Sequence, residues 1–143
     1  MNDELQRAAR TALACLDLTS LNDADTEADI AKLCARAAGP HDPVAAVCVW
    51  PRLAAFARTQ VPPSVGVAAV ANFPDGSTDV DRAVRDTQAI VAAGAQEVDV
   101  VLPWRALAAG DEEACRTLLA AVRRACDGRS PRDRVLLAAL ELR

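Results

Sequence analysis

Short apolar runs alternate along this chain with segments of helical length, and that alternation limits the fold more than any other feature of the sequence. Apolar runs bounded by turn residues are typical of strands buried on both faces of a parallel sheet. The segments between them have the apolar spacing of helices. The predicted strands fall at 15–22 (ending in a polar turn), 44–50, 65–71, 97–102 and 134–140, and the predicted helices at 3–14, 26–38, 51–61, 78–94, 104–109 and 112–126.

Repeated strand–helix units of this kind build parallel α/β folds. Two architectures fit the pattern. One is a small doubly wound sheet, and the other is part of a (β/α)8 barrel, whose complete form needs roughly 250 residues. No Gly-x-Gly-x-x-Gly or P-loop motif follows any predicted strand, which weakens the nucleotide-binding form of the first architecture.

Local signals mark several helix ends. Thr26 with Asp29 has the capping-box pattern, and Pro51 occupies a first helical position, where proline is favourable. The segment 72–76, Asn-Phe-Pro-Asp-Gly, has the composition of a turn. The acidic residues between 75 and 81 do not have the spacing of a calcium loop, and negative charge at the start of a helix explains them.

Composition sets broad limits on the protein class. The 143 residues are enough for one domain, and 52% apolar with only 3% aromatic residues predicts a core of alanine, valine and leucine. A net charge of −4 argues against nucleic acid or an anionic membrane as a partner. No apolar stretch approaches the length of a membrane span, and the amino terminus does not resemble a signal peptide. Five cysteines without a CxxC pair predict a reduced, cytoplasmic protein.

Polar side chains lie within or at the carboxyl end of four successive predicted strands, the edge that carries the chemistry in parallel α/β folds. Asp99 interrupts the apolar run at 97–102. A buried carboxylate without partners costs several kcal/mol, so Asp99 must be paired, hydrogen-bonded or protonated. The other three strands contribute Asp17, Cys48 and Asn72. We expect these four residues to form a shared site.

Four stretches resemble deoxyribose-phosphate aldolase, in that family's order and at about its spacing. They are Leu-Asp-Leu-Thr-Ser-Leu-Asn at 16–22, Ala-Ala-Val-Cys-Val-Trp-Pro-Arg at 45–52, Ala-Asn-Phe-Pro-Asp-Gly at 71–76 and Gly-Ala-Gln-Glu-Val-Asp-Val-Val-Leu-Pro-Trp-Arg at 94–105. The resemblance implies a partial (β/α)8 barrel, with residues 1–143 as one domain of about four βα units and a fifth strand. It also implies an enzyme that cleaves 2-deoxy-D-ribose 5-phosphate to acetaldehyde and glyceraldehyde 3-phosphate through a lysine imine, with no metal or other cofactor.

The resemblance assigns roles to five residues. Asp99 matches an aspartate that works with a second active-site lysine in proton relay, and Asp17 matches one that orders the polar network. Thr19, Cys48 and Asn72 are implied to lie near the substrate. Each has a local alternative: an Asx-turn or cap for Asp17, a backbone hydrogen bond for Thr19, a core position for Cys48, and the end of a strand for Asn72.

The imine-forming lysine is missing from this chain. The one lysine is Lys32, on the helix after the first strand, where the helical pattern predicts a peripheral position. The stretch 136–143 also lacks the lysine and the Glu-Thr-Gly that the family usually has there, so we expect the first half of such an enzyme, catalytically inactive alone. Two alternatives are a truncated, non-enzymatic remnant or interaction module and, more weakly, a small doubly wound domain that binds an anionic metabolite.

The open strand edges of half a barrel promote association. We therefore expect self-association or a complementing chain as partner, besides the small phosphorylated sugar of the complete enzyme. Two arginines that follow strands, Arg52 and Arg105, could offer charge to a phosphate, although a plain surface position is the commoner outcome for an arginine.

Overall fold

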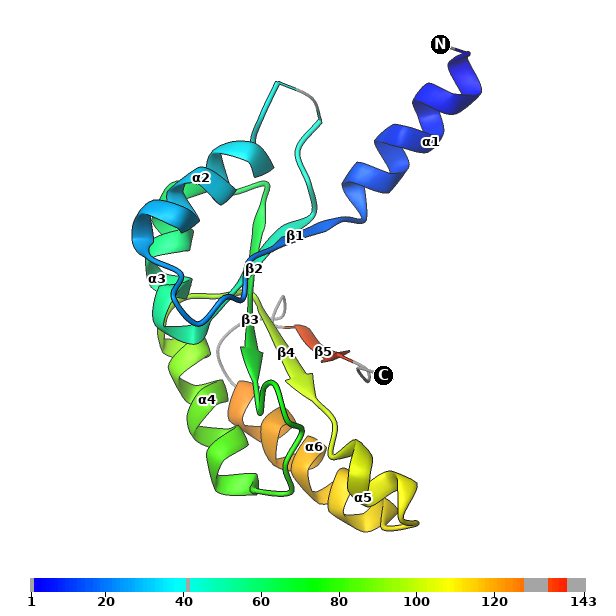
Figure 1. Cartoon of the computed structure of the whole chain (residues 1–143), viewed down its shortest axis with the longest axis vertical. Helices are drawn as coiled ribbons and strands as arrows, with labels where there is room; N and C mark the ends of the chain where they lie inside the picture. The colour runs from blue at the N-terminus through cyan, green and yellow to red at the C-terminus, as the bar shows by residue number, and fades with distance from the viewer. Residues whose placement is uncertain (1, 41, 128–133, 139–143) are drawn as a thin grey trace.

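Five parallel strands form one sheet, in which each strand pairs with the next along the chain (Figure 1). The computed structural model of the protein describes residues 2–40, 42–127 and 134–138, the last without its side chains. The strands are β1 (Asp17–Thr19), β2 (Ala46–Val49), β3 (Gly66–Ala71), β4 (Glu97–Val101) and β5 (Arg134–Ala138). The sheet order β1-β2-β3-β4-β5 follows the sequence order without a reversal.

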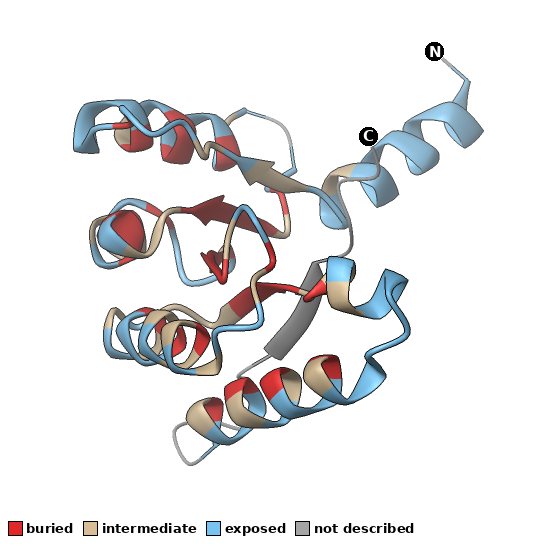
Figure 2. Ribbon diagram, turned by 60° about the horizontal axis from the view of Figure 1, so that its bottom comes forward, coloured by how far each residue is buried: buried red, intermediate tan, exposed pale blue. Residues whose placement is uncertain are grey.

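The helices that connect the strands form an outer layer around the curved sheet (Figure 2). Their contacts run α2 with β2, α3 with β2 and β3, α4 with β3 and β4, and α6 with β5. A doubly wound sheet has helices on both faces and a point where the strand order reverses. This chain has neither among its described residues, so the partial-barrel prediction is confirmed. The helices are α1 (Asp3–Ala14), α2 (Glu27–Ala37), α3 (Pro51–Gln60), α4 (Val80–Ala92), α5 (Trp104–Ala108) and α6 (Glu112–Cys126).

Local chemistry places the helix ends where the sequence predicts them. The Thr26 side chain accepts from the Asp29 backbone N–H, and the Asp29 carboxylate accepts from the Thr26 N–H, which completes the capping box. Pro51 is the first residue of α3. Asp79, at the start of the predicted helix 78–94, accepts from the Arg82 N–H at the start of α4. The predicted strand residues 139–140 lie outside the described residues.

The main core lies between the sheet and the helical layer. Alternate strand residues, among them Val47, Val67 and Val100, are fully buried against inward-facing residues of the helices such as Ile30 and Leu118. Small alanine and valine side chains let the helices approach the sheet closely, as the composition predicts. A second, smaller cluster occupies the other face of the sheet: Cys48, Ala68 and Val70, with Leu21, Trp50 and Phe73 packed against it.

Helix α1 extends away from the rest of the molecule (Figure 1). It is predicted correctly as a helix, but none of its residues is buried, and Leu5 is 58% exposed. Isolated helices of this length are marginal in water. No helix among the described residues is both long enough and apolar enough to cross a bilayer.

Candidate active site

The strand register brings four of the five predicted site residues, Asp17, Thr19, Cys48 and Asp99, to the face of the sheet opposite the helical layer. Thr19 pairs with Cys48, and Cys48 pairs with Ala68. Val70, two residues further along β3, pairs with Asp99. Since paired residues in a parallel sheet share a face and side chains alternate along each strand, these four residues all lie on this helix-free face.

The carboxylates of this face lie close together. Oxygen atoms of Asp17, Glu97 and Asp99 are all within 4.8 Å of one another. The Cys48 Sγ donates to Asp99 Oδ2 at 3.4 Å. Asp99 is 8% exposed, and its other oxygen, Oδ1, is buried without a hydrogen-bond partner among the described residues. The site therefore has an acceptor that is ready for a donor.

Glu97 is a member of this cluster that the sequence analysis missed. It opens β4 and pairs with Ala68, so it lies on the same face as Asp99. The sequence does contain a signal for Glu97: it lies two residues before Asp99, and residues two apart on a strand share a face. Its side chain lies beside that of Asp99 and acts to lower the Asp99 pKa.

Burial controls the electrostatics of the cluster. Desolvation raises the pKa of Asp99, and the nearby charge of Asp17 raises it further, while the hydrogen bond from Cys48 and the neighbouring Glu97 side chain act in the opposite direction. Burial also raises the pKa of Asp17. The pKa of the Cys48 thiol is raised strongly, first by burial and then by the Asp99 carboxylate. Cys48 therefore stays protonated and serves as a hydrogen-bond donor, not as a thiolate nucleophile.

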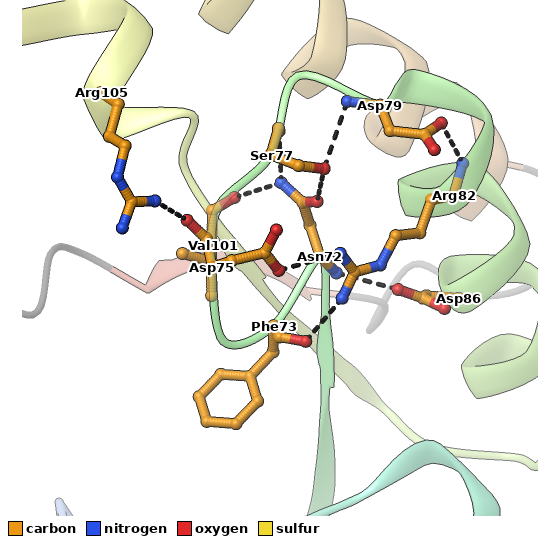
Figure 3. A network of polar contacts seen from close by, with 9 residues as sticks. All are labelled: Asn72, Phe73, Asp75, Ser77, Asp79, Arg82, Asp86, Val101 and Arg105. Carbon is orange, nitrogen blue, oxygen red and sulfur yellow. Dashed lines mark hydrogen bonds and ion pairs between the residues drawn. The ribbon is translucent and has the colours of Figure 1, made fainter.

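Thr19 and Asn72 do not join the carboxylates. The Thr19 hydroxyl donates to the Asp17 backbone carbonyl, which is the local alternative raised for it. The Asn72 amide donates to the Ser77 and Val101 carbonyls and accepts from the Ser77 hydroxyl (Figure 3). Asn72 thereby joins the carboxyl ends of β3 and β4, and a direct contact of either residue with substrate remains a prediction.

The loops at the carboxyl edge are tied to one another. The Arg82 guanidinium donates to the Asp75 carboxylate and to the Phe73 carbonyl, and Arg105 donates to the Asp75 carbonyl (Figure 3). On the neighbouring loops, Arg52 donates to the carbonyls of Asp23 and Asp25. Fixed loops of this kind hold a site in one geometry.

Two concave regions lie at opposite ends of the strands. A groove of about 610 Å³ lies at the amino ends of the strands, with Asp17 and Glu97 in its lining. A smaller pocket of about 260 Å³ lies at the carboxyl ends of β2 and β3, next to Trp50 and Phe73. The first opens the carboxylates of Asp17 and Glu97 to solvent, whereas Asp99 does not line it.

Comparison with known proteins identifies the family. The model of the DeoC/LacD family aldolases matches residues 11–142. The chain belongs to the DeoC/LacD aldolase family. The fold and the four sequence stretches described above agree with this membership.

Solved structures of similar proteins show how much longer the complete proteins are than this chain. A candidate deoxyribose-phosphate aldolase from Coccidioides immitis shares 26% identity, with a TM-score of 0.71, and is matched over 88% of this chain and 58% of its own. A second, from Toxoplasma gondii ME49 in its apo form, shares 25% identity, with a TM-score of 0.79, over 90% of this chain and 54% of its own. The chain thus spans little more than half the length of these aldolases. The tetrameric deoxyribose phosphate aldolase of Aeropyrum pernix, at 19% identity and a TM-score of 0.64, covers 81% of this chain and 49% of its own, and supports the fold alone.

Lys32, the single lysine in the sequence, cannot serve this site. It lies on α2, in the helical layer, and its side chain is exposed. The carboxylates lie on the opposite face of the sheet. The predicted peripheral position of Lys32 is confirmed.

Proposed function

We propose that this chain carries the strand-one to strand-five part of a deoxyribose-phosphate aldolase. The complete enzyme would be a lyase of deoxyribonucleotide catabolism in the cytoplasm that interconverts 2-deoxy-D-ribose 5-phosphate with acetaldehyde and glyceraldehyde 3-phosphate. The observation that supports this best is the meeting of Asp17, Cys48 and Asp99, from three family-like stretches, on one face of the sheet.

Asp99 has the environment that a proton relay needs. In an imine mechanism the substrate aldehyde condenses with a lysine amine. A carboxylate then takes the proton of the C3 hydroxyl as the C2–C3 bond breaks, and a proton is delivered to C2 of the enamine that remains. A carboxylate held by the Cys48 thiol, with Oδ1 still open, suits that exchange. An ammonium placed beside it would keep Asp99 ionised.

The lysines of this mechanism would come from residues outside these 143, because Lys32 is on the wrong face of the sheet. The remaining strands of the barrel would pair with β1 and β5, the two edges of the sheet. We therefore propose that these 143 residues alone are inactive and that further βα units, outside them, complete the barrel. The alternative of a non-enzymatic interaction module is separated from this one by the test below.

Complementation with a relative tests the proposal. The chain is co-expressed with the part of the Toxoplasma gondii protein that follows the aligned region, and the complex is treated with 2-deoxyribose 5-phosphate and borohydride. We expect cleavage activity and a reduced adduct on the added part, neither of which this chain gives alone. Asp99→Asn should abolish the activity, whereas Asp81→Asn, on an exposed turn of α4, should not.

A positive control is the same added part paired with its own amino-terminal half. If this control is active but the complex with the present chain is not, the result would contradict the proposed function and favour the interaction module. An adduct on Lys32 would contradict the assignment of the site.

A further inference from the structure

We propose that the carboxylates of Asp17, Glu97 and Asp99 bind a hard divalent cation of the size of calcium on the helix-free face of the sheet. The three side chains come from β1 and β4, and each offers one oxygen that lies within 4.8 Å of the other two. Calcium holds oxygen ligands at about 2.3–2.6 Å, so two ligands on opposite sides of the ion are about 4.6–5.2 Å apart. Three oxygens at the observed spacing can therefore share one such ion without a shift of the strands.

A buried oxygen distinguishes this cluster from a group of surface acids. Asp99 is 8% exposed, and its Oδ1 is buried without a hydrogen-bond partner among the described residues. The Cys48 Sγ holds the other oxygen, Oδ2, at 3.4 Å and so orients the carboxylate. A buried carboxylate oxygen needs a donor or a cation. Asp17 and Glu97 offer only further acceptors when they are ionised, whereas one cation satisfies all three carboxylates.

The negative charge of the cluster is not balanced by the ion pairs that the structure describes. Among the residues with described side chains, the ion pairs of arginine all involve other carboxylates, and neither Asp17 nor Asp99 takes part in one. Glu97 pairs in register with Arg134 of β5. Because a guanidinium would compete with a metal ion for carboxylate oxygens, the experiment below also varies Arg134.

The groove of about 610 Å³ at the amino ends of the strands gives a cation its path to the site. Asp17 and Glu97 line this groove and meet the ion first, and Asp99 is the inner ligand. Carboxylate oxygens suit calcium, magnesium and manganese, while the Cys48 thiol stays a donor to Asp99. Three protein oxygens leave the other positions to water, so binding should be weak, with a dissociation constant of roughly 10⁻⁴–10⁻³ M. The cation would occupy the place that an ammonium takes in the completed barrel, and it has no role in the proposed catalysis.

A paramagnetic ion locates the site directly. The ¹⁵N-labelled chain is freed of metal and titrated with Mn²⁺ near neutral pH, and the backbone amide signals are followed. We expect the signals of Leu18 and Val98, which adjoin the three ligands in the chain, to broaden first and to recover when Ca²⁺ is added in excess. The exposed acidic residues 111–113 at the start of α6 are a matched control, because they carry three carboxylates without a buried oxygen. Their amide signals should remain sharp.

Variants then test the ligands by calorimetry with Ca²⁺. Glu97→Gln and Asp99→Asn should each weaken binding at least about tenfold, because one of three carboxylates is lost, whereas Glu113→Gln on α6 should leave the affinity unchanged. Unchanged affinity in both ligand variants, or broadening of residues 111–113 together with the strand residues, would overturn the proposal. Binding that occurs only in Arg134→Gln would also overturn it, since a guanidinium would then already balance the cluster. Failure of the complementation experiment would contradict only the proposed function, because the cation titration needs no second polypeptide.

Discussion

The Sγ atom of Cys48 lies 3.4 Å from Oδ2 of Asp99, although 51 positions separate the two residues. The thiol donates and the carboxylate accepts. This contact joins β2 to β4 across β3, on the face of the sheet that no described helix covers. It keeps one oxygen of a buried carboxylate satisfied and leaves the other open.

Removal of this donor should change the titration of Asp99. In Cys48→Ala the carboxylate loses a hydrogen bond that lowers its pKa, so its pKa should rise further above the ordinary value. The lost bond and the small cavity should also lower the free energy of unfolding by about 1–2 kcal/mol. Carboxyl ¹³C NMR and urea unfolding measure the two effects. Cys48→Ser restores a donor and should return the pKa toward that of the wild type. An unchanged Asp99 pKa in the alanine variant would show that the contact has no electrostatic role.

Ionisation of Asp99 should make the free energy of unfolding decrease as pH rises. Its folded-state pKa is raised above 3.8 by burial, so the native state binds a proton more tightly than the unfolded state. The stability gained from this tighter proton binding is complete below the pKa of Asp99 in the unfolded state. It is lost as pH rises through the pKa of Asp99 in the folded state. Asp99→Asn removes the titration, so its stability relative to the wild type should increase between pH 4 and pH 7. Denaturant unfolding at several pH values measures this difference, and a difference that decreases over the same range would contradict the raised pKa.

Asn72 should matter for stability through both its amide and its backbone. Its φ is 54°, and its fully buried side chain makes three hydrogen bonds. Asn72→Ala should cost about 2–4 kcal/mol in the free energy of unfolding, at roughly 1 kcal/mol per bond. Asn72→Gly loses the same bonds but adopts positive φ readily, so it should be less destabilising by about 0.5–1 kcal/mol. Urea unfolding of both variants measures this difference. Equal losses would show that the backbone conformation carries no cost.

Gly76 and Gly110 form a matched pair of positive-φ positions. A Cβ on Gly76 would lie 2.4 Å from the Leu102 carbonyl oxygen, whereas a Cβ on Gly110 meets nothing within 4 Å. Gly110→Ala should therefore lower the free energy of unfolding by only about 1–2 kcal/mol, because alanine disfavours the left-handed conformation. Gly76→Ala should lower the free energy of unfolding by about 1–3 kcal/mol more than Gly110→Ala. The added Cβ would collide with the end of β4, so the β3–α4 loop must move away from it. Thermal unfolding of both variants tests this, and similar losses would mean that the loop is not packed tightly there.

Much of the fold follows from local sequence signals. The strand–helix alternation, the capping box of Thr26 and Asp29 and the bounds of α6 each depend on residues close together in the chain, where side-chain chemistry acts directly on the backbone. The exposure of α1 could not be predicted, because an apolar stripe does not show what it packs against.

The site was only partly predictable for the same reason. The sequence supplies Asp17 and Asp99 but not the strand register that brings their carboxylates within 4.8 Å. Register depends on contacts between distant segments. Asn72 illustrates the opposite case: its residue type suits a polar site, yet its positive φ and its bonds within the loop direct the amide away from the carboxylates.

The most direct test of the account is the pKa of Asp99 in the 143-residue chain, measured by carboxyl ¹³C NMR titration. A buried carboxylate that still lacks its cationic partner should titrate above the ordinary value of 3.8, and its pKa should fall when the complementing half of the barrel is added. A pKa at or below 3.8 in the chain alone would mean that the partner is already present, and would contradict the assignment of Asp99 as half of a proton relay.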